Sequence, residues 1–154
     1  MQVSIELQDL GLTQDKLNQI ASEISNTKPL MLKLGNHLYS IAVDSFEHEK
    51  DPSGNPWTPL KESTKKYKTT AKMLYDEGDM QRNLINRSTS SQAIVGIDSV
   101  FSDFSYPVMH QFGSKDGKLP ARPFMPIKED MSLYDDVEDE LEDIVFEFIE
   151  SALK

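Results

Sequence analysis

A long apolar stripe early in the sequence restricts the fold more than any other feature. It persists for several turns and consists of Leu30, Leu34, Leu38, Ile41 and Phe46, with Met31 and Ala42 beside them. Because side chains three and four positions apart share one face of a helix, the pattern predicts a helix to about residue 48 with a broad buried face. Pro29 fits the first turn of that helix, where a missing N–H costs little.

Apolar spacing predicts two further helices. Leu17, Ile20 and Ile24 recur at helical spacing, and Thr13 is a candidate N-cap for a helix that begins near Gln14. Residues 128–154 predict a C-terminal amphipathic helix. Its apolar stripe consists of Leu133, Val137, Leu141, Val145 and Phe148, widened by Ile144 and Ile149.

Strand signals are short. Val3, Ile5 and Leu7 alternate with polar residues, which predicts a short strand with one buried face. Residues 85–90 and 93–97 predict a hairpin joined through residues 90–92, with alternation of apolar residues in its second half.

The segments between these elements are rich in turn residues. Residues 51–56 predict a loop, and Trp57 is expected to anchor that loop to the core. Residues 61–72 are polar and basic, which fits either a mobile segment or a short helix. Asp79 is a candidate cap for a short helix through Leu84.

Two later segments contain the other strong backbone signals. Residues 106–113 predict one or two helical turns that end at a glycine C-cap. Prolines at positions 120, 123 and 126 favour extended backbone. The order of elements predicts an α+β fold in a single domain over residues 1–154. In this fold, N-terminal helices pack with a small antiparallel sheet and a C-terminal amphipathic helix.

Composition argues against several classes of function. The chain has no Cys, which excludes disulfides, thiolate zinc sites and a cysteine nucleophile. Its net charge of −10 argues against sequence-independent binding of nucleic acid, which depends on basic side chains. The sequence shows no signal-peptide pattern and no apolar run near the roughly 20 residues that span a bilayer. We therefore expect a cytoplasmic protein with no nucleic-acid or membrane partner.

Charge is unevenly distributed along the chain. The basic residues of the middle are Lys61, Lys65, Lys66, Lys68, Lys72, Arg82 and Arg87. The acidic residues near the end are Asp135, Asp136, Glu138, Asp139, Glu140, Glu142 and Asp143. Such asymmetry suits a protein that docks onto differently charged neighbours, and two solvated faces are the alternative.

The sequence contains no recognisable catalytic motif. It has no phosphate-binding glycine-rich loop and no nucleophile elbow. No histidine has another at i+4, and the side chains of Glu47, His48 and Glu49 point apart on a helix. His37 is interpreted as a boundary histidine, and His110 as a side chain that hydrogen-bonds backbone in a tight turn. We predict no catalytic residue, no metal, no cofactor and no small-molecule substrate.

The residues that stand out are therefore expected to be structural. They are Pro52, Gly54, Trp57, Leu60, Gly78, Gly96, His110, Gln111, Phe112, Gly113, Pro120, Arg122, Pro123 and Phe124. The candidates for contacts with partners are Lys65, Lys66, Lys68 and Arg122. Arg122, expected to be exposed between prolines, is a candidate to hold a carboxylate of a neighbouring chain, with a local salt bridge as the alternative.

Several of these residues lie in recognisable motifs. In order, they are Phe46 with DPSGNPWTPL at 51–60, a basic segment with Thr64, LYDEGDM at 74–80, AIVG at 93–96, Tyr106 with MHQFG at 109–113, and LPARPF at 119–124. Together they resemble the phage virion morphogenesis (tail completion) family over about residues 1–150. The HQFG and PARPF pair is the most specific part. The sequence departs from the family pattern at Pro107, where Ala is usual, at Glu77, where Thr is common, and in its more acidic C-terminal helix.

The resemblance implies a structural assembly protein of a tailed phage or prophage, with no enzymatic activity and no cofactor. Such proteins complete the tail and join it to the head, and the wider group tends to form rings around the tail axis, often six-fold. The expected partners are further copies of the chain and other phage tail or neck proteins. The expected locations are the host cytoplasm during assembly and then the virion tail or neck.

Three alternatives remain open at this point. The first is a head-closure or connector ring. The second is a domesticated prophage-derived binding module. The third is an enzyme, which requires a polar cleft that pairs His37 or His110 with a carboxylate.

Overall fold

The computed structural model describes residues 11–75, 78–98 and 105–154. It starts with helix α1 (Gly11–Ser25), followed closely by helix α2 (Lys28–His48). The strand expected at residues 3–7 lies outside the described residues. Thr13 is not an N-cap, because α1 begins two residues before it and Thr13 already belongs to the first helical turn.

Helix α2 confirms the helix expected from the long apolar stripe, with Pro29 in its first turn. The helix ends where Glu49 adopts a left-handed conformation (φ 54°) and its N–H donates to the carbonyl of Ser45. The carbonyl of Glu49 then accepts from the N–H of Trp57 at 2.8 Å. Its carboxylate accepts from the N–H of Met73 at 2.5 Å. One residue at the end of α2 therefore holds two later segments of the chain.

An aromatic cluster forms the core beside the end of α2. Trp57 is 4% exposed, and its Nε1 donates to the carbonyl of Pro123 at 2.7 Å. The ring of Phe46 lies edge-on to Trp57, with centroids 6.1 Å apart, and 4.9 Å from the ring of Phe124. Met80 completes this buried cluster. The prediction that Trp57 anchors its loop to the core is confirmed.

Two short helices follow the loop. Helix α3 (Glu62–Lys65) resolves the alternatives for residues 61–72 in favour of a short helix. Helix α4 (Asp79–Arg82) begins at Asp79, which is its first residue and not its cap. The expected end at Leu84 is wrong, because Leu84 already pairs with Ile97 in a sheet.

The sheet is the predicted antiparallel hairpin. Strand β1 (Leu84–Asn86) pairs with β2 (Val95–Ile97), with Ile85 opposite Gly96. Hydrogen bonds from Arg87 N–H to the carbonyl of Ile94 and from Thr89 N–H to that of Gln92 continue the pairing toward the turn. The hairpin packs against α2 at Gly35, where a Cβ atom would lie 2.0 Å from Ser88 Oγ.

Helix α5 (Ser105–Phe112) ends at Gly113, whose positive φ of 81° is the expected glycine terminus. The proline-containing segment that follows contains no helix between residues 118 and 127 and has bends at residues 118–119 and 125–126, so extended backbone along it stays a prediction.

Helix α6 (Asp135–Leu153) begins seven residues later than the amphipathic pattern predicted. Residues 128–134 form a turn instead, in which the N–H of Lys128 donates to the carbonyl of Ser132 at 2.8 Å. An isolated antiparallel bridge between Ile127 and Leu133 closes this turn. Leu133 therefore belongs to the bridge and not to the helix.

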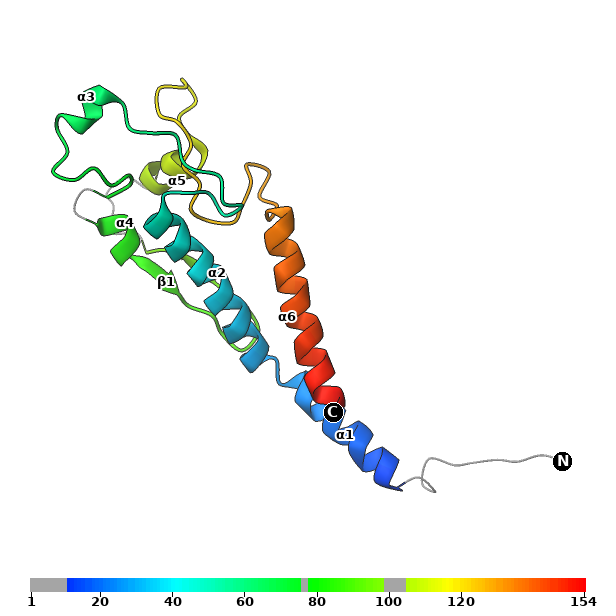
Figure 1. The fold of residues 1–154 in the computed structure, drawn as a ribbon. Helices are drawn as coiled ribbons and strands as arrows, with labels where there is room; N and C mark the ends of the chain where they lie inside the picture. The colour runs from blue at the N-terminus through cyan, green and yellow to red at the C-terminus, as the bar shows by residue number, and fades with distance from the viewer. Residues whose placement is uncertain (1–10, 76–77, 99–104) are drawn as a thin grey trace.

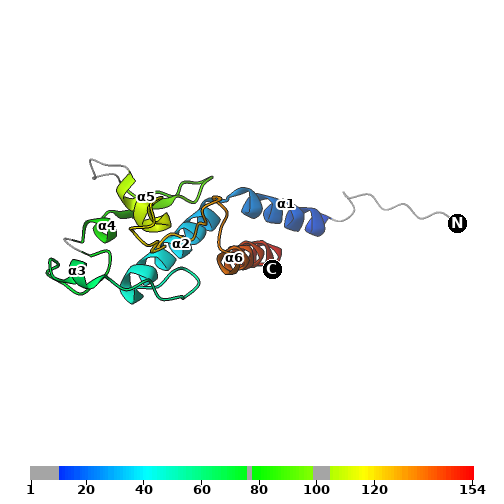
Figure 2. The ribbon, with the colours of Figure 1, turned by 90° about the horizontal axis from the view of Figure 1, so that it is seen from above.

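The long helices run side by side along the molecule. In Figure 1, α6 runs antiparallel to α2, and its C-terminal half also contacts α1. Figures 1 and 2 both place α3 and α1 at opposite ends of an elongated molecule. With its helices, small antiparallel sheet and C-terminal amphipathic helix, the architecture is the predicted α+β fold.

Candidate assembly surfaces

Gln111 fastens the proline-containing segment to α5. Its Oε1 accepts from the N–H groups of Phe124 and Met125, both at 3.0 Å. Its Nε2 donates to the carbonyls of Met125 at 2.8 Å and Ile127 at 3.1 Å. Apart from the isolated bridge at Ile127, this segment pairs with no strand among the described residues, so this one buried amide satisfies backbone groups that a sheet would otherwise satisfy.

The prediction that Arg122 is exposed is wrong. Arg122 is 4% exposed, and its guanidinium donates from Nε to the carbonyl of Thr58 at 2.9 Å and from Nη2 to that of Pro59 at 3.3 Å. These carbonyls lie in the loop after Trp57, outside regular secondary structure. Arg122 is therefore a buried brace between two loops, and its charge is not presented to a neighbouring chain.

The other motif residues are distributed around the same core and loops. Pro52 and Gly54 (φ 88°) lie in the loop after α2, and Gly78 (φ 79°) precedes α4. Gly96 lies in β2, and Phe112 and Gly113 end α5. Leu60 and Pro120 line a cavity beside His110. Gly78 is needed there for its positive φ, and also because a Cβ atom would lie 2.9 Å from the ring of Tyr75. The structure thus gives most of them backbone or packing roles.

A basic cavity of about 330 Å³ lies between the segment around residue 60, the end of α5 and the proline-containing segment. Its charged lining residues are Lys61, Lys68, Lys118 and Arg122, with His110 beside them. The part of the lining that the structure describes contains no carboxylate. Lys68 Nζ donates to the carbonyl of Tyr75 at 2.6 Å, and Lys61 Nζ to that of Lys118 at 3.0 Å.

His110 makes no hydrogen bond through its buried Nδ1, contrary to the expectation of a bond to backbone. The ring stands edge-on to Tyr106, with centroids 4.6 Å apart. Burial, and to a smaller extent the charges of Arg122 and Lys68, together lower the pKa of His110 to about 4. The imidazole is therefore neutral at neutral pH, and among residues 11–75, 78–98 and 105–154 it forms no ion pair with a carboxylate.

Residues 61–72, the basic arm, project at the α3 end of the molecule (Figure 1). Lys61 and Lys68 hold the two sides of the arm to neighbouring backbone, as described above. Between them, Tyr67 is 89% exposed, and Lys66 is also exposed. Lys65 Nζ pairs with Glu62 Oε1 at 2.7 Å within α3. The arm thus presents an aromatic ring with lysines on the same short stretch.

A second surface, the acidic groove, lies between α2 and α6. Its apolar lining residues are Leu34, Leu38, Ala93, Leu141, Val145 and Phe146, and its volume is about 410 Å³. Phe146 is 61% exposed. Glu138 and Glu142 stand one helical turn apart at the rim, and neither forms an ion pair with another described residue. The groove therefore combines an apolar lining with two carboxylates that form no direct ion pair, although Lys128 interacts electrostatically with Glu138.

Other carboxylates of α6 are already paired. Glu140 Oε2 lies 2.8 Å from Nε2 of His37, and Glu147 Oε2 lies 2.7 Å from Nζ of Lys33. Sequence spacing gave no signal for the first pair, because its members are 103 positions apart. This His–carboxylate pair bridges the exposed surfaces of two helices, and Glu140 is more than half exposed, so it does not form the polar cleft of an enzyme.

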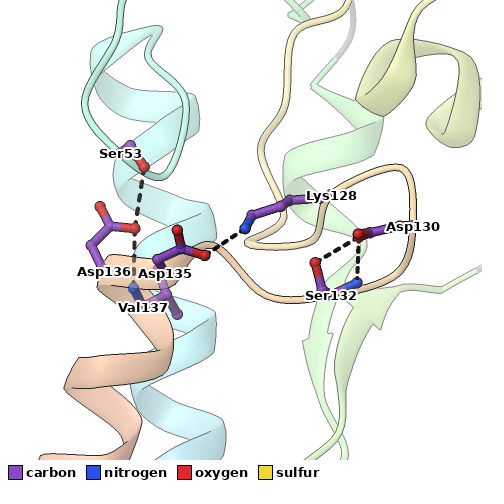
Figure 3. Close-up of polar contacts among 7 residues, drawn as sticks. All are labelled: Ser53, Lys128, Asp130, Ser132, Asp135, Asp136 and Val137. Atoms are coloured by element: carbon purple, nitrogen blue, oxygen red, sulfur yellow. Dashed lines mark hydrogen bonds and ion pairs between the residues drawn. The ribbon is translucent and has the colours of Figure 1, made fainter.

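The first turn of α6 is fixed by local polar contacts (Figure 3). Ser53 Oγ donates to Asp136 Oδ1 at 3.2 Å, which links the loop after α2 to α6. Lys128 Nζ donates to Asp135 Oδ1 at 2.5 Å. Asp130 accepts from the N–H and hydroxyl of Ser132 and so shapes the turn before the helix. Carboxylates at a helix N-terminus are also favoured by the helix dipole.

Among residues 11–75, 78–98 and 105–154, no group of three or more His, Asp or Glu side chains is arranged to hold a metal ion. Within the same ranges, no helix has the length and apolar character required to cross a membrane.

Comparison with known proteins identifies the family. No curated protein and no solved structure matches the chain. One family model, that of the phage virion morphogenesis family, matches residues 8–154. The match covers nearly the whole chain and includes every element described above. The chain therefore belongs to the phage virion morphogenesis family.

Proposed function

We propose that this protein completes the phage tail and joins it to the head, as a ring of several copies at the head-proximal end of the tail. Membership of a virion morphogenesis family supports a structural role in phage assembly. Its partners in this proposal are further copies of the chain and other tail or neck proteins of the phage. No catalytic step is part of it.

The observation that carries the proposal is the separation of two complementary surfaces on one elongated chain. The basic arm projects near α3, whereas the acidic groove lies along α6 (Figures 1 and 2). Two different patches on one protomer generate head-to-tail contacts, and such contacts close into a ring when the rotation between neighbours permits it. A self-complementary patch, by contrast, would stop at a dimer.

The test is disruption of the gene in its phage or prophage, followed by negative-stain electron microscopy of induced lysates. The proposal predicts filled heads beside separate, unjoined tails, with abnormal head-proximal tail ends. Normal infectious particles would overturn it and favour a domesticated binding module. Heads that lose their DNA beside tails of normal appearance would favour a head-closure ring instead.

Complementation distinguishes loss of this protein from polar effects of the disruption on neighbouring genes. A plasmid copy of the intact gene should restore joined particles. A matched copy with a stop codon early in α2 should not restore them, because it lacks the core of Phe46, Trp57 and Phe124.

A further inference from the structure

We propose that the tip of the basic arm of one copy docks into the acidic groove of the next copy. In this contact the ring of Tyr67 enters the groove between α2 and α6, and Lys65 and Lys66 face Glu138 and Glu142. The inference rests on the proposed assembly role and names the contact through which copies would join.

The first step concerns Tyr67. It is the most exposed of the large hydrophobic side chains described, at 89%. The arm on either side is held by Lys61 at the carbonyl of Lys118 and by Lys68 at the carbonyl of Tyr75. A tethered arm loses less conformational freedom on docking than a free one. Tyrosine is among the residues that most often anchor protein interfaces, because a rigid ring buries a large area.

The second step concerns the groove. Its floor consists of aliphatic side chains from both helices, including Leu38 and Leu141, and Phe146 forms an exposed aromatic wall. A volume of about 410 Å³ lies within the range of cavities that accommodate small organic ligands, so it has room for one aromatic side chain. Burial of an aromatic ring against such a floor removes apolar surface of both copies from water.

The third step concerns charge. Glu138 and Glu142 are one turn apart and unpaired within the described part of the chain, and Lys66 is an exposed cation next to Tyr67. Lys65 pairs only with the exposed Glu62 of its own short helix, a contact that is easily exchanged. Lysines of the arm that face these two glutamates would therefore fix the register of the Tyr67 ring and speed the encounter of two copies.

A second copy is the occupant because one chain carries both halves of the contact at separate places. The arm lies at the α3 end and the groove along α6, and they lie apart in both views (Figures 1 and 2). The arm of a chain therefore does not fill the groove of the same chain. Docking of copy on copy leaves a free arm at one end of the chain of copies and a free groove at the other end until a ring closes.

The absence of Cys from the native chain allows a clean cross-linking test. One variant carries Thr69→Cys, at an exposed position two residues after Tyr67 that leaves the ring in place, and the other carries Ala93→Cys, at a small residue that lines the groove. Mixed together under mild oxidation, or with a short bis-maleimide, they should form a covalent dimer. The matched control replaces Ala93→Cys with Ser151→Cys, an exposed position on α6 outside the groove lining, and should give at least tenfold less dimer.

The charge argument has its own test by reversal. Lys65→Glu with Lys66→Glu in the Thr69→Cys chain should reduce the cross-linked dimer at least tenfold. Glu138→Lys with Glu142→Lys in the Ala93→Cys chain should restore it. Circular dichroism checks that the exposed substitutions leave the fold intact. Failure of the reversed groove to rescue the reversed arm would overturn the pairing proposed here.

The cross-link is measured in concentrated purified protein and in lysates in which phage particles assemble. A specific dimer in either sample supports the inference. Its absence from both overturns the inference. Disruption of the gene is assessed separately by microscopy, so loss of joined particles without the cross-link would leave the proposed function standing and reject only this contact.

Discussion

Gln111 shows how much one buried polar side chain can organise. It bonds two N–H groups and two carbonyls of a segment that, apart from the bridge at Ile127, pairs with no strand among the described residues. We expect Gln111→Ala to lower the free energy of unfolding by about 3 kcal/mol, because several buried backbone groups lose their partners together. Urea denaturation measures this. The exposed Gln92→Ala serves as the control, with an expected change within about 0.5 kcal/mol. Equal effects of the two substitutions would contradict the bracing role.

His110 makes stability depend on pH in a defined direction. Burial, with Arg122 and Lys68, lowers its pKa in the folded chain to about 4, against about 6.5 when unfolded. The unfolded chain therefore binds a proton first as the pH falls. The contribution of His110 to the free energy of unfolding is complete above about pH 6.5 and is lost as the pH falls from there to about 4.

We expect this histidine to cost roughly 1 kcal/mol of stability between pH 7 and pH 5, a value reduced to allow for its partial exposure. Carboxylates also titrate as the pH falls, so the measurement is a comparison with His110→Gln. Urea denaturation at both pH values should show a smaller loss for the variant than for the native chain. An identical loss would show that another group carries the effect.

Individual side chains also mark the limits of sequence reasoning. Trp57 was predictable as an anchor because an aromatic residue after a proline-rich loop has few other roles. The burial of Arg122 was not, because a sequence does not show that the carbonyls of Thr58 and Pro59 lie within its reach. The His37–Glu140 pair depends in the same way on how two distant helices pack.

At the scale of elements, the α2–α6 seam depends on apolar contact more than on its ion pairs. Val137 of α6 is 2% exposed. Val137→Ala should lower the free energy of unfolding by about 2 kcal/mol, from lost burial and the cavity left behind. Thermal or urea denaturation tests this, with the exposed Val108→Ala of α5 as the matched control.

Lys33→Ala, which breaks a solvent-exposed ion pair between α2 and α6, should change the free energy of unfolding little. A larger loss from Lys33→Ala than from Val137→Ala would reverse this ranking.

Element type was more predictable than element boundaries. The long periodic stripe predicted helix α2 well, and the apolar alternation after the hairpin turn predicted the second strand. The start of α6 was misplaced, because Leu133 fits a helical stripe as well as the bridge to Ile127 that it makes. Periodicity records only which side chains are buried, and a bridge and a helix bury the same leucine.

At the scale of the whole molecule, the sequence indicated two blocks of opposite charge but not where they lie. Folding pairs some of the acidic residues of α6 with Lys33 and His37 and leaves Glu138 and Glu142 unpaired at a groove. The groove combines α2, α6 and Ala93, two residues before β2, which are far apart in sequence. Which carboxylates of α6 are paired and which are not therefore depends on how the helices pack, and the sequence alone does not show it.

If opposite charges join the copies, association should weaken as salt screens them. The Debye length falls from about 10 Å at 0.1 M ionic strength to about 3 Å at 1 M. The rate at which Thr69→Cys and Ala93→Cys chains cross-link should fall severalfold over this range. The same pair with Lys65→Gln and Lys66→Gln in the arm should start slower and respond less to salt. Cross-linking that accelerates with salt in both pairs would show that apolar burial of the Tyr67 ring drives the contact and that the carboxylates at the rim do not guide it.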